Sequence, residues 1–160
     1  MFLISPFTEA DLAAVKALVD HTIDVSYADV YQPAVIAFFK EYHNRECILG
    51  DAQVGHTLVI EEEGALIATG TLLGTNVRRM FVDPTAQGRG LGQALLSSLE
   101  EYARILGLTA LDLSSSLPAY HFYLRRGYTT DSEETILLAN GEVLHFYAMS
   151  KMLVLEHPPR

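Results

Sequence analysis

The stretch that most constrains this chain is a glycine-rich run, VDPTAQGRGLGQALL, at residues 82–96. It predicts a strand end, a tight turn and the start of a helix that we expect to run from about Gly90 to Leu106. Such a junction directs unpaired backbone N–H groups and the positive end of a helix dipole at one place. It is typical of a site for an anion, above all a phosphate, because glycine lets the anion come close to the backbone.

Two common phosphate-binding motifs do not fit this run. A Walker A loop requires Lys followed by Ser or Thr after its last glycine, whereas Gly92 is followed by Gln and Ala. The dinucleotide pattern G-x-G-x-x-G/A also fails, because its last position falls on Gln93 or Leu95. The pattern that remains is Q-x-x-G-x-G, formed by Gln87, Gly90 and Gly92.

A second motif, AYHFYLRRGY at residues 119–128, follows after one predicted helix and one predicted strand. The two motifs together resemble the signatures of the GNAT superfamily of N-acetyltransferases, Q-x-x-G-x-G and A-x-x-F-Y-x-x-x-G-Y/F. The resemblance covers roughly Val77 to Met152. It implies that acetyl-CoA is the co-substrate and that its acetyl group moves to a primary amine by direct attack, without a metal.

The resemblance also assigns roles to residues. Backbone N–H groups of the glycine loop would bind the pyrophosphate, and a strand that parts from its neighbour, commonly at a bulge, would polarise the carbonyl. Tyr123 would return a proton to the leaving thiolate, which a neutral phenol can do. The implied cofactor-binding residues are Met80, Phe81, Val82, Gln87, Gly88, Arg89, Gly90, Leu91, Gly92, Gln93, Ser116 and Tyr123.

Two positions depart from the family pattern. Ser116 stands where many members have Asn, and Asn76 stands where some have a Glu that acts as the base. The base is therefore a water chain or another residue, for which Tyr27, Asp29, Tyr31 and His145 are the candidates. We expect His145 to be catalytic and, with Tyr27 and Tyr31, to bind the acceptor. Strand alternation would place His145 on the sheet face of Tyr147.

Composition narrows the class of protein. The net charge of −9 and the absence of a basic cluster beyond two Arg-Arg pairs argue against a nucleic-acid partner. An acidic chain would attract a cationic amine, either a small molecule or a peptide. No apolar run approaches the length of a membrane span. The lone Cys47 fits a reducing, cytoplasmic environment, and no His/Cys/Asp set has metal-ligand spacing.

Periodicity predicts one α/β domain over residues 1–160, with the element order β-α-α-β-β-β-α-β-α-β-β of the GNAT fold. This order implies a central mixed, mostly antiparallel sheet with helices on both faces. A homodimer through the C-terminal strands is allowed by analogy. We expect a loop from Asn44 to Gly55, outward-facing Glu100 and Glu101, a two-residue type I′ turn at Asn140-Gly141, and fraying at residues 157–160.

A second reading of the same motifs is a catalytically weak acyl-CoA-binding sensor or regulatory module. The missing Glu at position 76 favours it, and the retained Tyr123 argues against it. The acceptor amine itself is not specified by any motif.

Overall fold

Seven strands form one sheet in the order β1-β2-β3-β4-β5-β7-β6, and all neighbouring pairs are antiparallel except β4 and β5, which are parallel. The computed structural model describes residues 2–154, so the predicted fraying at 157–160 lies outside the described residues. The strands are β1 (Leu3–Pro6), β2 (His56–Glu62), β3 (Ala65–Leu73), β4 (Asn76–Val82), β5 (Ala110–Ser115), β6 (Thr129–Leu137) and β7 (Val143–Met152).

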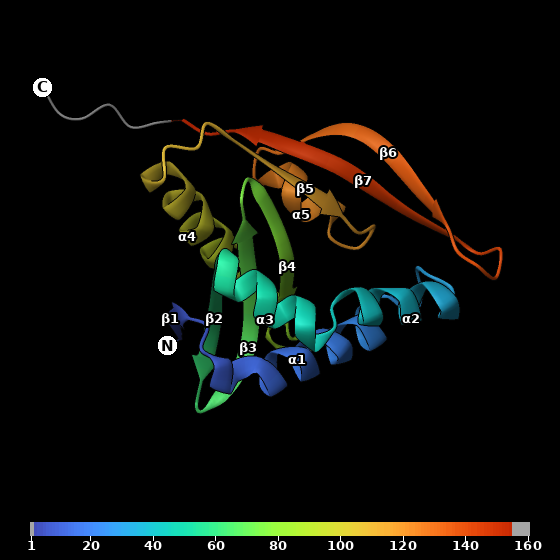
Figure 1. Cartoon of the computed structure of the whole chain (residues 1–160), viewed down its shortest axis with the longest axis horizontal. Coiled ribbons are helices and arrows are strands. Elements are labelled where there is room, and N and C mark those ends of the chain that lie inside the picture. The colour runs from blue at the N-terminus through green and yellow to red at the C-terminus, as the bar shows by residue number, and fades with distance from the viewer. Residues whose placement is uncertain (1, 155–160) are drawn as a thin grey trace, which may run out of the picture.

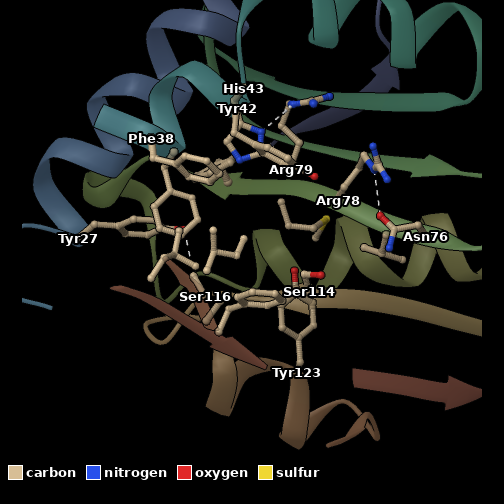
Figure 2. Close-up of a pocket in the computed structure, with 18 residues that line it drawn as sticks. Tyr27, Phe38, Tyr42, His43, Asn76, Arg78, Arg79, Ser114, Ser116 and Tyr123 are labelled. Carbon is tan, nitrogen blue, oxygen red and sulfur yellow. Dashed lines mark hydrogen bonds between the residues drawn. The ribbon is translucent and has the colours of Figure 1, made fainter. Parts of the chain in front are cut away.

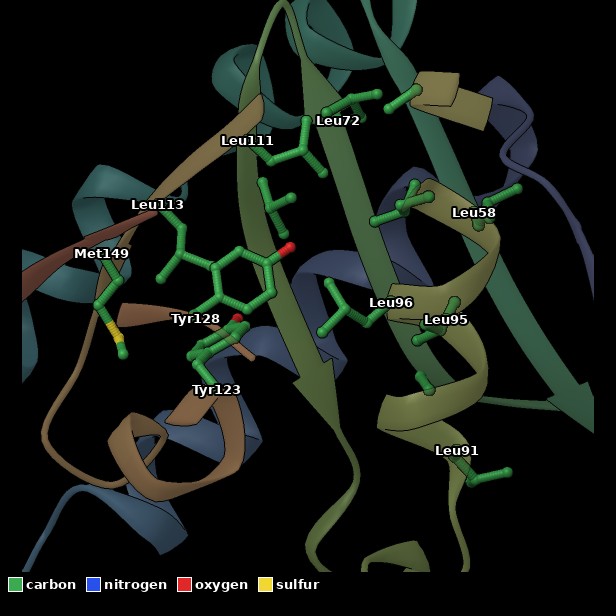
Figure 3. Packing of buried hydrophobic residues seen from close by; sticks show 14 of the residues in the cluster. Leu58, Leu72, Leu91, Leu95, Leu96, Leu111, Leu113, Tyr123, Tyr128 and Met149 are labelled. Atoms are coloured by element: carbon green, nitrogen blue, oxygen red, sulfur yellow. The ribbon is translucent and has the colours of Figure 1, made fainter. Parts of the chain in front are cut away.

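Helices cover both faces of this sheet, which confirms the predicted architecture (Figure 1). They are α1 (Leu12–Ser26), α2 (Pro33–Tyr42), α3 (Arg45–Val54), α4 (Leu91–Ile105) and α5 (Tyr120–Arg125), with short 3-10 turns η1 (Glu9–Asp11) and η2 (Pro84–Ala86). Helices α1, α2 and α3 bury one apolar cluster, and α4 and α5 bury the other. The second cluster packs the leucines of α4 against strand residues such as Leu72 and Leu111 (Figure 3).

The predicted loop from Asn44 to Gly55 is wrong, because this segment forms α3. Asn44 caps the helix by accepting a hydrogen bond from the Cys47 N–H at 2.9 Å. The apolar pattern is weak because Ile48 is the one fully buried residue of α3 and Val54 is 83% exposed. The helix is therefore specified by its cap and by packing on the sheet rather than by an apolar face.

The hairpin between β6 and β7 has a different turn from the predicted type I′. The Gly141 N–H donates to the Leu138 carbonyl at 3.0 Å, and the Leu138 N–H donates to the Glu142 carbonyl at 2.8 Å. Gly141 has a φ of 90°, whereas Asn140 is not among the positive-φ residues. This is a three-residue connection in which a turn is followed by one left-handed glycine.

Glu100 also departs from its predicted outward position. It is 6% exposed and accepts hydrogen bonds from the Tyr128 hydroxyl at 3.0 Å and from Lys151, whose Nζ lies 2.9 Å away. A buried carboxylate is tolerated here because it is paired with a cation and a hydroxyl donor. Helical periodicity did not reveal these partners because they come from outside α4.

Candidate active site

A gap in the middle of the sheet positions the candidate site. Strands β4 and β5 pair at two positions only, Asn76 with Asp112 and Val77 with Leu113. Beyond Val77 the two strands part, and within residues 2–154 no strand pairs with that side of β4 up to Val82. The predicted separation of this strand from its neighbour is thus present in the structure.

A bulge in β4 accompanies the gap. Thr69 of β3 pairs with Phe81 and Thr71 pairs with Arg78, so Gly70 alone opposes two residues of β4, Arg79 and Met80. Arg79 adopts a left-handed φ of 53°. Gly70 leaves room for the Met80 side chain, because a Cβ there would lie 2.4 Å from the Met80 sulfur and would force that side chain to shift. The bulge turns both arginines to the α3 side, where each contacts Asp51.

Backbone groups at the end of β4 face the gap. The Asp83 N–H donates to the Ile67 carbonyl of β3 at 2.8 Å. Because bonding direction alternates along an antiparallel strand, the backbone of Val82 is directed away from β3. In agreement, the Val82 carbonyl accepts a hydrogen bond from the Gln87 side-chain amide at 3.1 Å.

Two pockets open along the gap and meet at its centre. The larger, about 460 Å³, lies at the glycine loop and is called the loop pocket. The smaller, about 210 Å³, lies where Arg78 and Arg79 line the wall and is called the arginine pocket (Figure 2). Both pockets are lined by Tyr27, Met80, Phe81, Ser116, Ala119 and Tyr123.

The glycine loop has the geometry of an anion cradle. Gly88 and Gly90 adopt φ values of 80° and 81°, which favour glycine. The first intrahelical bond of α4 runs from the Ala94 N–H to the Gly90 carbonyl, so the preceding N–H groups have no helical acceptor. Gly92 allows close packing, since a Cβ there would lie 3.3 Å from the Phe122 ring.

Ten of the twelve predicted cofactor-binding residues line the loop pocket: Met80, Phe81, Val82, Gln87, Gly88, Gly90, Leu91, Gly92, Ser116 and Tyr123. The other two, Arg89 and Gln93, do not line it. Arg89 instead forms a bidentate salt bridge with Glu62 of β2. Gln93 Oε1 accepts a hydrogen bond from Arg126 Nη2 at 3.2 Å.

The basic side chains of the loop pocket come from α5 and the residue after it. Arg125 and Arg126 line the pocket, and the Arg126 guanidinium carbon lies 4.6 Å from the centre of the Phe122 ring. These residues were not among the predicted ligands. They stand inside the second sequence motif, between Tyr123 and Gly127, and this position was the available signal.

Tyr123 lies where the two pockets meet. Its side chain is 6% exposed, and its hydroxyl makes no hydrogen bond within the described part of the chain. Burial raises the pKa of this phenol above its ordinary value. The group therefore stays protonated at neutral pH, as a proton donor must.

Tyr27 also borders both pockets, and Tyr31 does not border either. The Tyr27 hydroxyl donates to Ser116 Oγ at 3.1 Å, and burial raises the pKa of Tyr27 to about 12. The Tyr31 hydroxyl donates to the His145 carbonyl and accepts from the Leu117 N–H, both at 2.9 Å. Instead of lining a pocket, Tyr31 ties the α1–α2 connection to β7 and to the segment after β5, and its role in binding the acceptor stays a prediction.

The structure also moves the predicted base away from the site. The His145 side chain is exposed and lines neither pocket, because its neighbours Leu144 and Phe146 take the pocket side of β7. Alternation places His145 with Tyr147, as expected, but that face stacks on Tyr120 of α5. Asp29 is exposed and also lies outside both pockets.

The arginine pocket holds a histidine that the sequence did not single out. His43 is 7% exposed, and its Nδ1 accepts a hydrogen bond from Arg79 Nε at 3.1 Å. Burial, together with the charge of Arg79, lowers the pKa of His43 to about 3. The neutral imidazole therefore carries its proton on Nε2 and acts as a donor there.

The charge of the residues that line both pockets is opposite in sign to the net charge of the protein. The protein has a net charge of −9, yet none of the described residues that line either pocket is Asp or Glu. Four arginines line them, Arg78 and Arg79 in one and Arg125 and Arg126 in the other. The site thus suits anionic groups, and the acidic charge that favoured a cationic acceptor lies elsewhere.

Two further features bear on the chemistry. Within residues 2–154, no cluster of three or more His, Cys, Asp or Glu side chains is arranged to hold a metal ion. None of the helices in that range has the length and apolar character of a bilayer-spanning helix.

Comparison with known proteins places this geometry in context. Residues 53–130 match the family model of the acetyltransferase (GNAT) domain. An IAA acetyltransferase from Azospirillum brasilense is 49% identical over 41 residues, which make up 26% of this chain and 27% of that protein. The match therefore spans about a quarter of the relative's length.

Solved structures resemble the chain over nearly its whole length. A GCN5-related N-acetyltransferase from Rhodopseudomonas palustris is 25% identical with a TM-score of 0.86, over 94% of this chain and 95% of that one. The PaiA N-acetyltransferase from Thermoplasma acidophilum, solved in complex with coenzyme A, is 16% identical with a TM-score of 0.77, over 95% and 99% of the chains.

Proposed function

The chain belongs to the GNAT superfamily of acetyltransferases, and we propose that it transfers the acetyl group of acetyl-CoA to an amine by direct attack. The observation that carries the proposal is the gap beside β4, which ends at the glycine loop and has the unpaired Tyr123 hydroxyl at its centre. Acetyl-CoA supplies the activated acetyl group as a thioester.

The residues of the loop pocket fit this co-substrate. The N–H groups at the start of α4 that have no helical acceptor would donate to the pyrophosphate, and Arg125 and Arg126 would balance its charge. The open side of β4 would receive the pantetheine arm as if it were another strand. The backbone N–H of Val82, which is directed away from β3, would stabilise the negative charge that develops on the carbonyl oxygen.

Tyr123 is proposed as the general acid. The amine nitrogen forms a bond to the acetyl carbon, the carbon–sulfur bond breaks, and the Tyr123 hydroxyl gives its proton to the leaving sulfur. The amine must also lose a proton. Because the described lining contains no carboxylate and His43 Nδ1 is occupied by Arg79, we propose that water removes it.

The test is calorimetric titration with acetyl-CoA, followed by an assay of thiol release with a panel of amines. Binding together with amine-dependent release supports the transferase. Binding without release from any amine would instead support an acyl-CoA-binding sensor, and no binding would overturn the site assignment.

A further inference from the structure

We infer that the acceptor is an amine that also carries a carboxylate and an apolar side chain, as an apolar or aromatic amino acid does. This inference rests on the proposed function and names the class of acceptor. It is argued from the arginine pocket, which touches Tyr123 at one side and has a wall of charged donors at another (Figure 2).

The charged wall has more positive than negative charge. Arg78 and Arg79 share one carboxylate, Asp51, at 3.5 and 3.0 Å from their nearest nitrogens. Arg79 is 2% exposed at its side chain, and its Nη1 is buried without a hydrogen-bond partner in the described residues. A buried cation that is incompletely paired favours an anion nearby.

Arg78 is the group that can reach a ligand directly. Its side chain is 29% exposed and lines the pocket. Its Nε donates to Asn76 Oδ1 at 2.9 Å, which fixes the guanidinium, while the long 3.5 Å contact with Asp51 leaves the outer nitrogens weakly engaged. A guanidinium held in this way presents a fork that matches a carboxylate.

His43 adds a neutral donor to the same wall. Arg79 fixes its tautomer, so that Nε2 bears the proton. Its lowered pKa keeps it uncharged across the physiological range, and so it contributes a hydrogen bond rather than a charge.

The rest of the pocket lining is largely apolar. Its large side chains come from α2 and the β6–β7 hairpin: Phe38, Phe39, Tyr42, Ile136, Leu144 and Phe146. Tyr42 and Ile136 remain 52% and 38% exposed at the rim. The volume of about 210 Å³ is below the roughly 300–1,000 Å³ of drug-sized ligand sites. A single small acceptor therefore fits better than a polyamine or a large cationic drug.

The experiment compares three acceptors that differ at one group: phenylalanine, phenylalanine amide and phenethylamine, with aspartate as the polar reference. Thiol release from acetyl-CoA is measured as kcat/KM for each. We expect phenylalanine to exceed phenethylamine and the amide by roughly 10- to 100-fold, the worth of a charge-assisted hydrogen bond. Aspartate should react poorly because its second carboxylate meets the apolar wall.

The variant Arg78→Gln should raise KM for phenylalanine by a similar factor and leave phenethylamine unchanged. Arg45→Gln, which removes the same charge from the exposed start of α3, is the matched control and should change neither. Equal or better use of phenethylamine, or an unchanged KM in Arg78→Gln, would overturn the acceptor class while leaving acetyl transfer intact. Acetyl-CoA binding without release from any amine would overturn the proposed function, and the acceptor class with it.

Discussion

At the scale of single residues, removal of the Tyr123 hydroxyl should affect catalysis but not packing. It makes no hydrogen bond within the described residues, so Tyr123→Phe should leave the free energy of unfolding and acetyl-CoA affinity nearly unchanged. We expect kcat to fall by roughly 10²-fold, because a general acid contributes about that much or more. Thiol-release assays measure kcat, and calorimetry measures the affinity for acetyl-CoA. A large loss of acetyl-CoA affinity would show that Tyr123 binds rather than catalyses.

Tyr128 is the matched control, since it lies against Tyr123 with ring centres 5.7 Å apart. Its hydroxyl donates to buried Glu100, so Tyr128→Phe should cost roughly 1–3 kcal/mol of stability. It should leave kcat unchanged below the melting range. Tyr123→Phe should therefore lower kcat without lowering stability, and Tyr128→Phe should lower stability without lowering kcat.

His43 makes stability depend on pH in a predictable direction. Its folded pKa of about 3 lies below the unfolded value of 6.5, so the unfolded chain binds the proton first as pH falls. Stability is complete above pH 6.5 and declines as pH falls towards 3. Between pH 7 and pH 5 this residue should remove about 2 kcal/mol. Urea unfolding at both values should show a smaller loss in His43→Gln; an equal loss would contradict the buried neutral imidazole.

At the scale of elements, the glycine loop depends on its backbone conformation. Gly90 has φ 81° and open space around its Cβ position, so Gly90→Val acts through backbone strain and through blocking the N–H groups. We expect acetyl-CoA binding to be abolished in calorimetry while the circular dichroism spectrum is retained.

Gly64 provides the control for that strain. It lies in the β2–β3 turn with φ 80° and nothing near its Cβ position, but outside both pockets. Gly64→Val should lower the free energy of unfolding by about as much as Gly90→Val does, and it should bind acetyl-CoA normally. Unchanged binding in Gly90→Val would remove the loop from the site.

Glycine spacing and apolar periodicity predicted the loop and the strands around it, because both depend directly on the backbone conformation. Tyr123 was singled out by the resemblance of residues 119–128 to the family motif. Local patterns missed the arginine pocket for a physical reason. Strict alternation would place Arg78 and Arg79 on opposite faces, and the bulge that unites them appears only in the pairing of β4 with β3. His145 lies outside the pockets for a related reason, because alternation placed it on the same face as Tyr147 but did not show which face of β7 borders the pocket.

At the scale of the whole molecule, the gap divides the sheet into two arms, β1 to β4 and β5 to β7. Few pairings join them, so side chains that cross the gap matter for stability. Tyr31, in the α1–α2 connection, is the clearest, because it packs in the cluster that contains Phe81 of β4 while its hydroxyl donates one hydrogen bond to His145 of β7 and accepts one from Leu117. Tyr31→Phe should lower the free energy of unfolding by roughly 1–3 kcal/mol, measured by urea denaturation, because the Leu117 N–H loses its acceptor.

Tyr42→Phe is the control for that variant, because Tyr42 is 52% exposed and its hydroxyl has no hydrogen-bond partner in the described residues. It should leave stability unchanged. Equal stability of Tyr31→Phe and the parent protein would mean that the arms are held together by packing alone.

The unpaired side of β4 is a sheet edge in the middle of the sheet rather than at its margin. Edges at the margin can recruit other strands, whereas this one faces two pockets and offers its amide groups to a ligand that enters them. Amide hydrogens on this side should therefore exchange with deuterium faster than those bonded to β3, and slow once the pantetheine amides complete the ladder. If acetyl-CoA binds as proposed, its pantetheine arm would take the place of a strand beside β4.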